Sequence, residues 1–193
     1  MPDKYKATWV SYSSISDWQK CPRAYFLKNV YKDSTTGNKI TLMKPALALG
    51  RAVHETLEGL LDLPKEERLQ QDLENIFSNE WKQVSGEQGG FNSKEQEQKY
   101  KKRGLDMLSH VKENPGPITN LAVKIKDGLP NFWLDKDEEI ILCGRVDWLE
   151  YLPDKESVHI IDFKTGKNRE EQESLQLPIY LLLASECQSW DID

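Results

Sequence analysis

The sequence has little cysteine and no long apolar run. Its 193 residues include three cysteines, Cys21, Cys143 and Cys187, which lie far apart and form no Cys-x-x-Cys pair. A disulfide framework and a self-contained zinc site both need paired spacings, so this pattern argues against both and favours a reducing compartment. No segment approaches the roughly 18 apolar residues that cross a bilayer. We therefore expect a cytoplasmic protein with no membrane partner.

The chain also lacks a positive net charge. Lys and Arg number 26 against 32 Asp and Glu, which gives a net charge of −6. This balance argues against a protein that coats nucleic acid by bulk attraction, although it leaves room for a local basic groove. The 38% of hydrophobic residues suffices for a real core. We expect one domain over residues 1–193, neither repetitive nor disordered.

Two strand-like runs near the end of the chain are joined by a turn at 152–156. Centring the hairpin loop on that turn places Asp147 opposite Asp162. Side chains alternate along a strand, so Lys164 falls on the same face as Asp162, with Arg145 opposite it. The sequence therefore predicts two carboxylates and an ammonium group on one small patch.

Such a patch needs a stabilising partner. Two carboxylates ~4 Å apart repel by about 1 kcal/mol in water and about 4 kcal/mol at an effective dielectric of 20. Lys164 offsets part of this repulsion, and a divalent cation with oxygen ligands offsets more. The competing interpretation is a surface hairpin with an ordinary, weak Asp–Lys ion pair. Both faces of the hairpin are apolar, so we expect it inside a sheet covered on both sides, which favours the cation site.

Helical spacing dominates the first 113 residues. Ser13 or Ser14 is expected to cap a short helix, and Pro22 to end it and begin another. Longer helices are expected over 46–61 and 65–84, and over a stretch capped by Ser93 that ends near Glu113.

One of these helices carries a candidate metal ligand. His54 and Glu58 are four residues apart and project from one side of the helix over 46–61. A lone histidine at a helix edge is usually just a half-buried polar residue. Alternatively, Gly50 allows this helix to approach the sheet closely, and His54 then reaches a metal held by the two aspartates.

Two further features of the helical half have open interpretations. Cys21 is either a small buried hydrophobic residue or a metal or cluster ligand whose partners come from elsewhere. Lys101, Lys102 and Arg103 form either a solvated helix face or a patch that binds a nucleic-acid backbone.

Strand-like periodicity begins after the Pro-rich stretch 114–117. Strands are expected near 121–125, 132–134 and 139–144, with Cys143 packed in the core. A leucine-rich helix over 170–187 carries Gln176 and Tyr180, four residues apart. This polar pair needs a hydrogen-bond partner if it is buried, and otherwise lies at the solvent edge of the helix. No strand is expected after this helix.

Four motifs stand in a fixed order and together carry a resemblance. They are Gly50-Arg51-Ala52-Val53-His54, Gly144-Arg145-Val146-Asp147, Asp162-Phe163-Lys164-Thr165-Gly166 and Gln176-Leu177-Pro178-Ile179-Tyr180. Any one alone is weak, but four in order are specific. The chain resembles the RecB-like branch of the PD-(D/E)XK nuclease superfamily, which includes CRISPR-adaptation exonucleases and the nuclease domains of helicase-nucleases. The resemblance implies an α/β (α+β) fold with a restriction-endonuclease-like core: a central mixed sheet flanked by helices, with a helical N-terminal insertion.

The resemblance also implies a metal centre. His54, Asp147 and Asp162 would bind Mg²⁺ or Mn²⁺, and the backbone carbonyl of Phe163 would be a further ligand. A metal between two carboxylates makes a water molecule more acidic and neutralises charge on the phosphate during attack. Imidazole beside carboxylates makes manganese acceptable as well as magnesium.

Other residues of the same motifs take roles by the same resemblance. Lys164 would orient the attacking water or help to deprotonate it, and would stabilise charge on the phosphate. Gln176 and Tyr180 would position the active-site groups and the DNA backbone, and are counted with the two aspartates and Lys164 as catalytic. The candidates for contact with DNA are Arg145, Thr165, Lys167, Lys101, Lys102 and Arg103.

The corner over 13–27 resembles the N-terminal piece of a subgroup that holds a four-iron cluster. In that subgroup one cysteine precedes the nuclease core and three follow it. Cys21 matches the first, and the other three are absent. We therefore expect a C-terminally truncated chain that lacks the last core strand, with a 4Fe-4S cluster only in a longer chain. An unpaired sheet edge and an exposed Cys21 would follow.

The leading hypothesis is a divalent-metal-dependent DNA nuclease, an exonuclease that acts on single strands or duplex ends in repair, recombination or CRISPR adaptation. A helicase or a CRISPR adaptation protein is the candidate partner. The alternative is a non-catalytic DNA-end-binding or helicase-associated module, and in a third hypothesis the acids and Lys164 serve stability alone. The single domain is expected to comprise an N-terminal corner over 1–44, a helical region over 45–113, and a sheet with the Gln/Tyr helix over 118–193.

Overall fold

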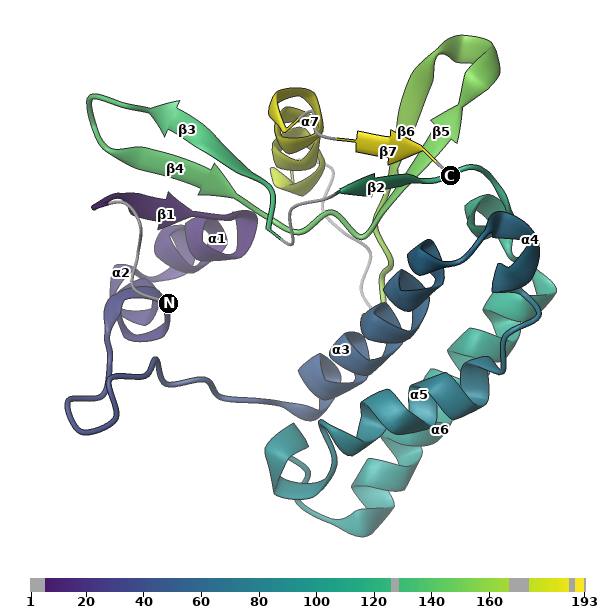
Figure 1. The fold of residues 1–193 in the computed structure, drawn as a ribbon. Coiled ribbons are helices and arrows are strands. Elements are labelled where there is room, and N and C mark those ends of the chain that lie inside the picture. Colours follow the sequence, from purple (N-terminus) through teal and green to yellow (C-terminus); the bar gives the residue numbers. More distant parts are fainter. Residues whose placement is uncertain (1–5, 126–128, 167–173, 188–189, 193) are drawn as a thin grey trace. The chain divides into compact units, whose positions relative to one another are not determined.

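A computed structural model describes residues 6–125, 129–166, 174–187 and 190–192 (Figure 1). These residues fall into two compact units that alternate along the chain. The sheet unit comprises Met1–Thr41, Ile125–Arg145 and Glu171–Ser189, and the helical unit comprises Leu42–Lys124, Val146–Glu170 and Trp190–Asp193. The expected mixture of helices and strands is confirmed, with a mixed sheet in the first unit and most helices in the second.

The sheet unit contains a mixed sheet of three strands in the order β1-β4-β3 (Figure 1). The central strand β4 (Ile140–Cys143) pairs in parallel with β1 (Thr8–Val10) and antiparallel with β3 (Asn131–Asp135). Both β3 and β4 were predicted from periodicity. Ile141 and Leu142 are buried, so the middle of β4 is covered on both faces of the sheet.

The N-terminal corner consists of three short helices: α1 (Tyr12–Lys20), α2 (Pro22–Tyr25) and the π-helix η1 (Phe26–Val30). The predicted cap at Ser13 or Ser14 was wrong. Ser11 caps α1, because Ser14 occupies the third helical position and exchanges hydrogen bonds with Ser11 in a capping box. Pro22 begins α2, as predicted.

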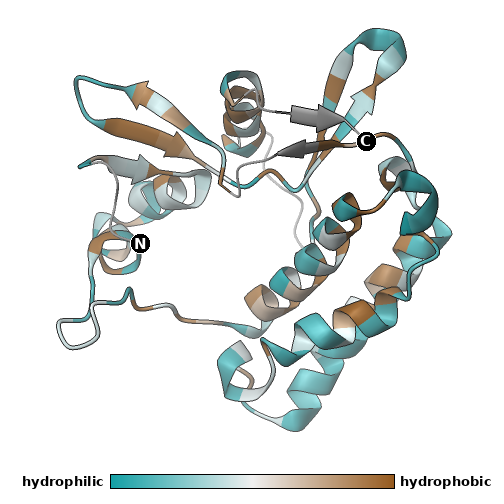
Figure 2. Cartoon of the chain, in the orientation of Figure 1, coloured by the Kyte–Doolittle hydropathy of each residue, from teal (hydrophilic) through white to brown (hydrophobic). Residues whose placement is uncertain are grey.

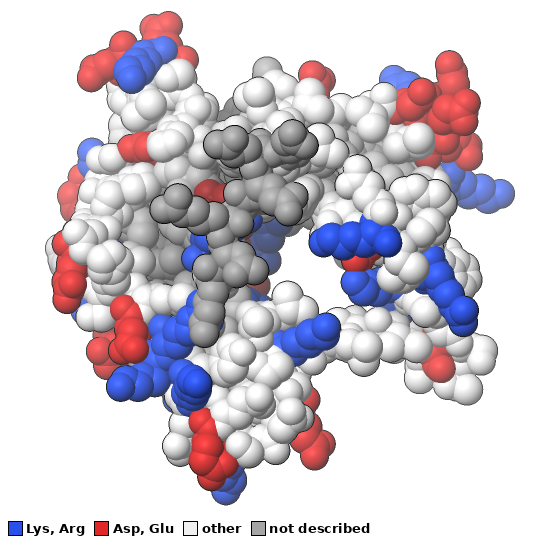
Figure 3. Space-filling view, turned by 180° about the vertical axis from the view of Figure 1, so that it is seen from behind, with Lys and Arg blue, Asp and Glu red and all other residues white. Residues whose placement is uncertain are grey.

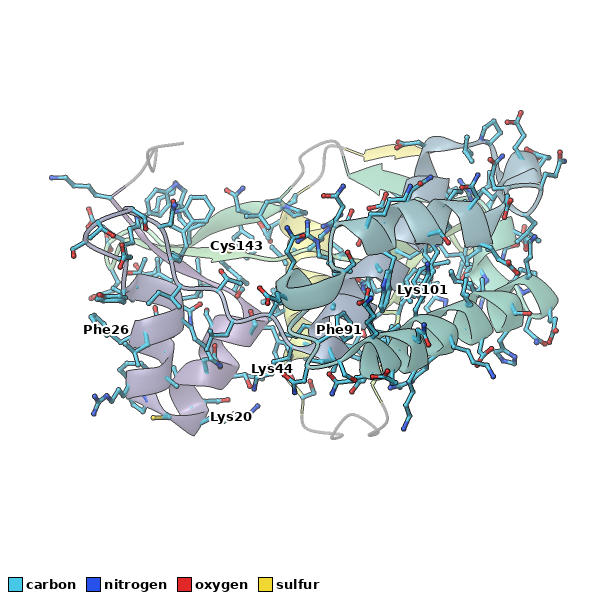
Figure 4. All side chains as sticks on the ribbon, turned by 90° about the horizontal axis from the view of Figure 1, so that it is seen from below. Lys20, Phe26, Lys44, Phe91, Lys101 and Cys143 are labelled. Atoms are coloured by element: carbon cyan, nitrogen blue, oxygen red, sulfur yellow. The ribbon has the colours of Figure 1, made fainter. Side chains whose placement is uncertain are left out.

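The side chains of this corner are more exposed than their composition indicates. Trp18 is 55% exposed and Phe26 48% exposed, and Figure 4 shows Phe26 on this helical corner. Cys21 is also exposed, which excludes the interpretation of it as a small buried hydrophobic residue. Cys143 is buried in the sheet, as expected, and its Sγ lies 3.4 Å from the carbonyl oxygen of Val10.

The last helix of the sheet unit, α7 (Gln176–Glu186), begins later than expected. The predicted start near residue 170 lies outside the described residues, and Ser174 and Leu175 are not helical. The chain passes close to α7 at Gly144, just after β4, because a Cβ at that position would lie 2.8 Å from Cδ1 of Leu183. Only glycine permits this approach without displacing the leucine.

Helices form most of the helical unit. They are α3 (Pro45–Glu58), η2 (Gly59–Asp62), α4 (Lys65–Arg68), α5 (Leu73–Lys82), η3 (Gly86–Gly89), α6 (Lys94–Glu113) and η4 (Gly116–Thr119). Ser93 caps α6, as predicted. The expected continuous helix over 65–84 is wrong, because Asp72 caps a new helix at α5.

The core of this unit lies where α3 packs against α5 and α6 (Figure 1). Leu49 of α3, Phe77 of α5 and Leu108 of α6 are each at most 1% exposed. Gly104 brings α6 close, since a Cβ there would lie 2.3 Å from the Phe77 ring. Apolar residues alternate with polar ones along all three helices in Figure 2, as expected of helices with one buried face.

The predicted hairpin forms in the predicted register. It consists of β5 (Trp148–Leu152), the 3-10 turn η5 (Pro153–Lys155) and β6 (Ser157–Ile161). Trp148 pairs with Ile161 and Leu152 with Ser157. Asp147 and Asp162 therefore follow as the next opposed positions beyond the paired segment.

The expectation that both faces of the hairpin are covered was wrong. Val158 of β6 is 43% exposed, and within the described residues β6 pairs only with β5. The other edge of β5 is engaged, because the amide of Tyr151 donates to the carbonyl of Leu121 and Ala122 bridges Glu150. β5 is thus the buried strand, and β6 lies at an edge where apolar side chains remain exposed.

A strand follows α7, contrary to the prediction. β7 (Trp190–Ile192) pairs with β2 (Val123–Ile125). Three residues are too few for a periodicity of two to be recognised in sequence. Among the described residues, no helix is both long and apolar enough to cross a membrane.

A buried arginine ties helix α4 to the start of the hairpin within the helical unit. Arg68 is fully buried, and its guanidinium donates to the carbonyls of Leu60, Leu63, Ile118 and Asn120 at 2.9–3.1 Å. It also lies 5.2 Å from the ring centroid of Trp148. Trp148 directly follows Asp147, so this contact fixes the backbone next to the first predicted acid.

Candidate metal centre

Asp147 is the most tightly held of the predicted acids. Its Oδ2 accepts a hydrogen bond from the backbone N–H of Phe163 at 2.8 Å, and its Oδ1 lies 3.1 Å from Nδ1 of His54. The residue is 5% exposed. Asp147 therefore links the open end of the hairpin to helix α3 through His54.

His54 is accompanied by a second ligand type from the same helix. One ligand atom each from His54, Glu58 and Asp147 lie within 4.8 Å of one another. Glu58 was not among the predicted site residues, although its four-residue spacing from His54 already placed both on one side of α3. Among the described residues, Asp162 does not belong to this group of three closely spaced ligands. It nevertheless lies close enough to Asp147 for the charge of Asp147 to affect it.

The surroundings of His54 favour its charged form. Burial lowers the pKa of the imidazole, but the hydrogen bond and negative charge of Asp147 outweigh this effect. The backbone of Phe163 and the charge of Glu58 act in the same direction as Asp147. The net result is a pKa above the ordinary value of 6.5. In the absence of a metal, the proton on His54 thus partly compensates the two carboxylates.

Asp162 and Lys164 form the second half of the site. Nζ of Lys164 lies 2.8 Å from Oδ2 of Asp162, whose side chain is only 9% exposed. Burial raises the pKa of Asp162, and the nearby charge of Asp147 raises it further, against the opposing effect of Lys164. One ammonium group therefore does not fully compensate two neighbouring buried carboxylates.

Phe163 separates these two halves. Its ring lies 6.3 Å from the His54 ring and 6.1 Å from the Trp148 ring, both with edge-to-face geometry. Its backbone N–H donates to Asp147, so the peptide group that joins Asp162 to Phe163 is held in place. Its carbonyl, the predicted fourth ligand, belongs to the adjoining peptide.

The donor set fits a hard divalent cation. Carboxylate oxygens and one imidazole nitrogen suit Mg²⁺ and Mn²⁺, and no cysteine is among the closely spaced ligands of the described residues. The charges of Asp147 and Glu58 raise the pKa of His54, and burial, with a smaller contribution from Asp147, raises the pKa of Asp162. A cation bound there would favour the charged form of both carboxylates.

Gln176 and Tyr180 lie in the sheet unit and satisfy each other. Nε2 of Gln176 donates to the hydroxyl of Tyr180 at 2.8 Å, and the two residues are 7% and 8% exposed. The interpretation of this pair as a solvent-edge feature is therefore wrong. A four-residue spacing on α7 brings the two polar groups together within the apolar side of the helix.

The predicted DNA contacts are distributed over both units. Arg103 donates from Nη2 to the backbone carbonyl of Thr165 at 2.6 Å. Oγ1 of Thr165 would lie 3.2 Å from a Cβ at Gly50, so α3 approaches the segment after β6 closely at this position. The remaining candidates have these positions: Lys101 is half-buried on α6 (Figure 4), Lys102 and Arg145 are exposed, and Lys167 lies outside the described residues.

Both signs of charge are present on the face seen in Figure 3, and several basic side chains lie next to one another there. The net charge of the whole chain is −6, so recognition of a polyanion would depend on locally placed cations rather than on bulk attraction.

Comparison with known proteins adds one finding. The profile of the PD-(D/E)XK nuclease superfamily matches the chain from residue 9 to residue 191, while no curated protein and no solved structure matches it. The mixed α+β architecture is consistent with the restriction-endonuclease-like fold of that superfamily, whose members are metal-dependent nucleases that hydrolyse phosphodiester bonds. With the acids, the lysine and the histidine in the order and geometry described above, this chain belongs to the PD-(D/E)XK nuclease superfamily.

Proposed function

We propose that this nuclease is a deoxyribonuclease of the RecB-like branch, which digests DNA from single-stranded or duplex ends. The observation that carries the proposal is the hydrogen bond between His54 and buried Asp147, next to the ion pair of Asp162 and Lys164. The helical Gly-x-x-x-His motif distinguishes the proposed branch, and His54 belongs to that motif. Its contact with the first acid gives the motif a role at the site.

His54, Glu58, Asp147 and Asp162 would hold the cation in this proposal. Bound Mg²⁺ or Mn²⁺ would make a water molecule more acidic and offset negative charge on the scissile phosphate. Glu58 extends the ligand set expected from sequence, because its carboxylate lies within the closely spaced group.

Lys164 would act on the substrate directly. Its side chain is 48% exposed while Nζ contacts Asp162, so the ammonium group is both anchored and accessible. It would hold the attacking water or donate a hydrogen bond to a phosphate oxygen as the new P–O bond forms and the leaving P–O bond breaks. Asp147, fixed by the Phe163 amide, would keep this segment in register with α3.

Gln176 and Tyr180 would act as positioning residues. Their mutual hydrogen bond would fix the orientation of both side chains, and in this proposal the pair orients the DNA backbone. The biological setting would be repair, recombination or CRISPR adaptation, with a helicase or a CRISPR adaptation protein as partner. Support for this setting comes from the four motifs in their fixed order.

A cleavage assay tests the proposal. End-labelled single-stranded and duplex DNA is incubated with the wild type in Mg²⁺ or Mn²⁺, and products are resolved by length over time. Progressive shortening from an end supports an exonuclease, whereas discrete internal fragments support an endonuclease. The Lys164→Ala variant should lose activity, and Lys155→Ala, at an exposed lysine of the hairpin turn, should retain it. Equal cleavage by wild type and Lys164→Ala would contradict the proposed site.

The same material tests the non-catalytic alternative. Calorimetric uptake of Mg²⁺ or Mn²⁺ that disappears in Asp147→Ala supports the enzyme. Salt-sensitive DNA binding without metal uptake or cleavage would instead support a DNA-end-binding module.

A further inference from the structure

The helical unit contains an open pocket beside the candidate metal centre. Its volume is about 420 Å³, within the range typical of small-molecule sites. Two helices, α3 and α6, and the segment 163–165 line it. Arg103, Met107 and Val111 repeat every four residues along α6, so one face of that helix forms a wall of the pocket.

The interior of the pocket is apolar. Val53 and Leu57 of α3 contribute fully packed side chains, 4% and 2% exposed, and Met107 and Val111 of α6 line it from the other helix. Phe163 adds an aromatic ring. This combination suits the face of a flat aromatic ring, because aromatic and thioether groups pack well against π faces.

Charged groups are also part of the lining. Arg103, Lys164 and His110 are basic or titratable, and Asp106 is the acidic member. Arg103 is fixed in place, since its Nη2 donates to the Thr165 carbonyl at 2.6 Å. An occupant with a flat aromatic ring and an attached anionic group would match this arrangement, and the carboxylate of Asp106 could accept from an N–H at the ring edge.

The pocket shares two consecutive residues with the surroundings of the metal centre. Phe163 lines the pocket with its side chain while its backbone N–H binds Asp147. Lys164 also lines the pocket while its Nζ contacts Asp162. A group seated in the pocket is therefore joined through two consecutive residues to the proposed place of phosphate cleavage.

We propose that this pocket receives one unpaired nucleobase of the strand being cut, with the neighbouring phosphate held by Arg103 and Lys164. The inference rests on the proposed nuclease function and names the form of its substrate. A base in a duplex must be unstacked and unpaired before it can enter such a pocket. Single strands and frayed ends are therefore preferred over intact duplex.

The test uses an oligonucleotide in which one abasic residue is moved along the strand. Affinity is measured by fluorescence anisotropy with Ca²⁺ in place of Mg²⁺, and gels verify that the oligonucleotide stays intact. For the wild type, removal of the base at one position should weaken binding by about tenfold or more, the effect of one lost base–aromatic contact. Equal affinity at every abasic position would overturn the proposal.

Protein variants provide the second arm. Met107→Trp fills the pocket, so this variant should bind the intact strand only weakly. Its affinity should match that of the wild type for the strand whose abasic residue weakens binding most, and it should no longer distinguish the two strands. Ser109→Trp places the same side chain at an exposed position of α6 and should behave as wild type. Circular dichroism and thermal melting verify folding, and Val111→Trp replaces Met107→Trp if the latter does not fold. A folded pocket-filling variant that still discriminates as well as the wild type would contradict the pocket assignment.

Cleavage in Mg²⁺ or Mn²⁺ separates this inference from the function on which it rests. Lys164-dependent cleavage without base discrimination would overturn the pocket and leave the nuclease in place. Base discrimination without cleavage would support the pocket and contradict the nuclease.

Discussion

In the helical unit the buried polar groups carry charge, whereas in the sheet unit a comparable pair is neutral. His54, Asp147 and Asp162 are partly or wholly buried, and charge on each affects its neighbours. Gln176 and Tyr180 are equally buried, but they share a hydrogen bond without net charge. Buried charge needs an opposite charge or a metal ion as its partner, and a hydrogen-bonded neutral pair does not. The helical unit is therefore where a cation should change stability and activity together.

Removal of Asp147 should have the largest effect. Asp147→Ala removes a metal ligand, the partner of His54 and the acceptor of the Phe163 amide at once. Cleavage should fall by roughly a thousandfold or more, because several kcal/mol of transition-state stabilisation are lost. Initial rates together with calorimetry of Mn²⁺ binding measure this. Asp154→Ala, in the exposed turn η5, is the matched control, and metal uptake by Asp147→Ala comparable to wild type would remove Asp147 from the ligand set.

A change in the neutral pair should separate activity from metal binding. Tyr180→Phe removes the hydroxyl that accepts from Gln176, which should cost about 1 kcal/mol of unfolding free energy. If the pair positions the substrate, cleavage should fall by about 10- to 100-fold, since small misplacements have effects of this size. Calorimetry should give an unchanged affinity for Mn²⁺. Tyr151→Phe is a control on the hairpin, and a lost metal affinity in Tyr180→Phe would break the contrast between the two units.

The Asp162→Asn variant should be more stable than the metal-free wild type at neutral pH. The pKa of Asp162 is raised in the folded protein, so between the ordinary and the raised value the folded state binds more protons than the unfolded state. Wild-type stability therefore falls as the pH rises through that window, and the neutral amide escapes this loss. Thermal melting with and without Mg²⁺ measures both consequences. Mg²⁺ should raise the melting temperature of the wild type more than that of Asp162→Asn, and an equal increase in both would separate Asp162 from the cation.

His54 should impose a smaller pH dependence of the same sign. Its pKa is raised on folding, so its contribution to stability is complete below the ordinary value of 6.5 and is lost as the pH rises through the folded value. His54→Gln should therefore flatten the decline in melting temperature of the metal-free protein above pH 6.5. Melting curves across this range test the slope, with His110→Gln on the exposed side of α6 as control. A slope unchanged in His54→Gln but altered in His110→Gln would reverse the assignment.

Features that depend on local spacing could be predicted from sequence. The turn at η5 set the register of β5 and β6, so the opposition of Asp147 and Asp162 followed from counting residues. The cap of α6 at Ser93 and the start of α2 at Pro22 also follow from local backbone chemistry. The order of the motifs led to the superfamily that the profile match then established.

Features that depend on packing between distant parts of the sequence could not be predicted from the sequence. Glu58 stands next to His54 by helical spacing, but only the approach of α3 to the hairpin made its carboxylate a neighbour of Asp147. Burial of the N-terminal corner was overestimated, because aromatic composition does not indicate what covers Trp18 or Phe26. The exposed side of β6 and the strand β7 were missed because pairing partners, not periodicity, decide them.

The sequence by itself determined that Asp147 and Asp162 lie opposite each other at the open end of the hairpin. Alternation along strands and the geometry of a short turn are local properties. The tertiary structure alone decided that α3 brings the imidazole of His54 and the carboxylate of Glu58 next to Asp147. It also decided that a pocket remains between α3 and α6. Contacts between residues some 90 positions apart, such as His54 with Asp147, depend on how whole helices pack, and side-chain volume and burial across the core fix that packing rather than any motif.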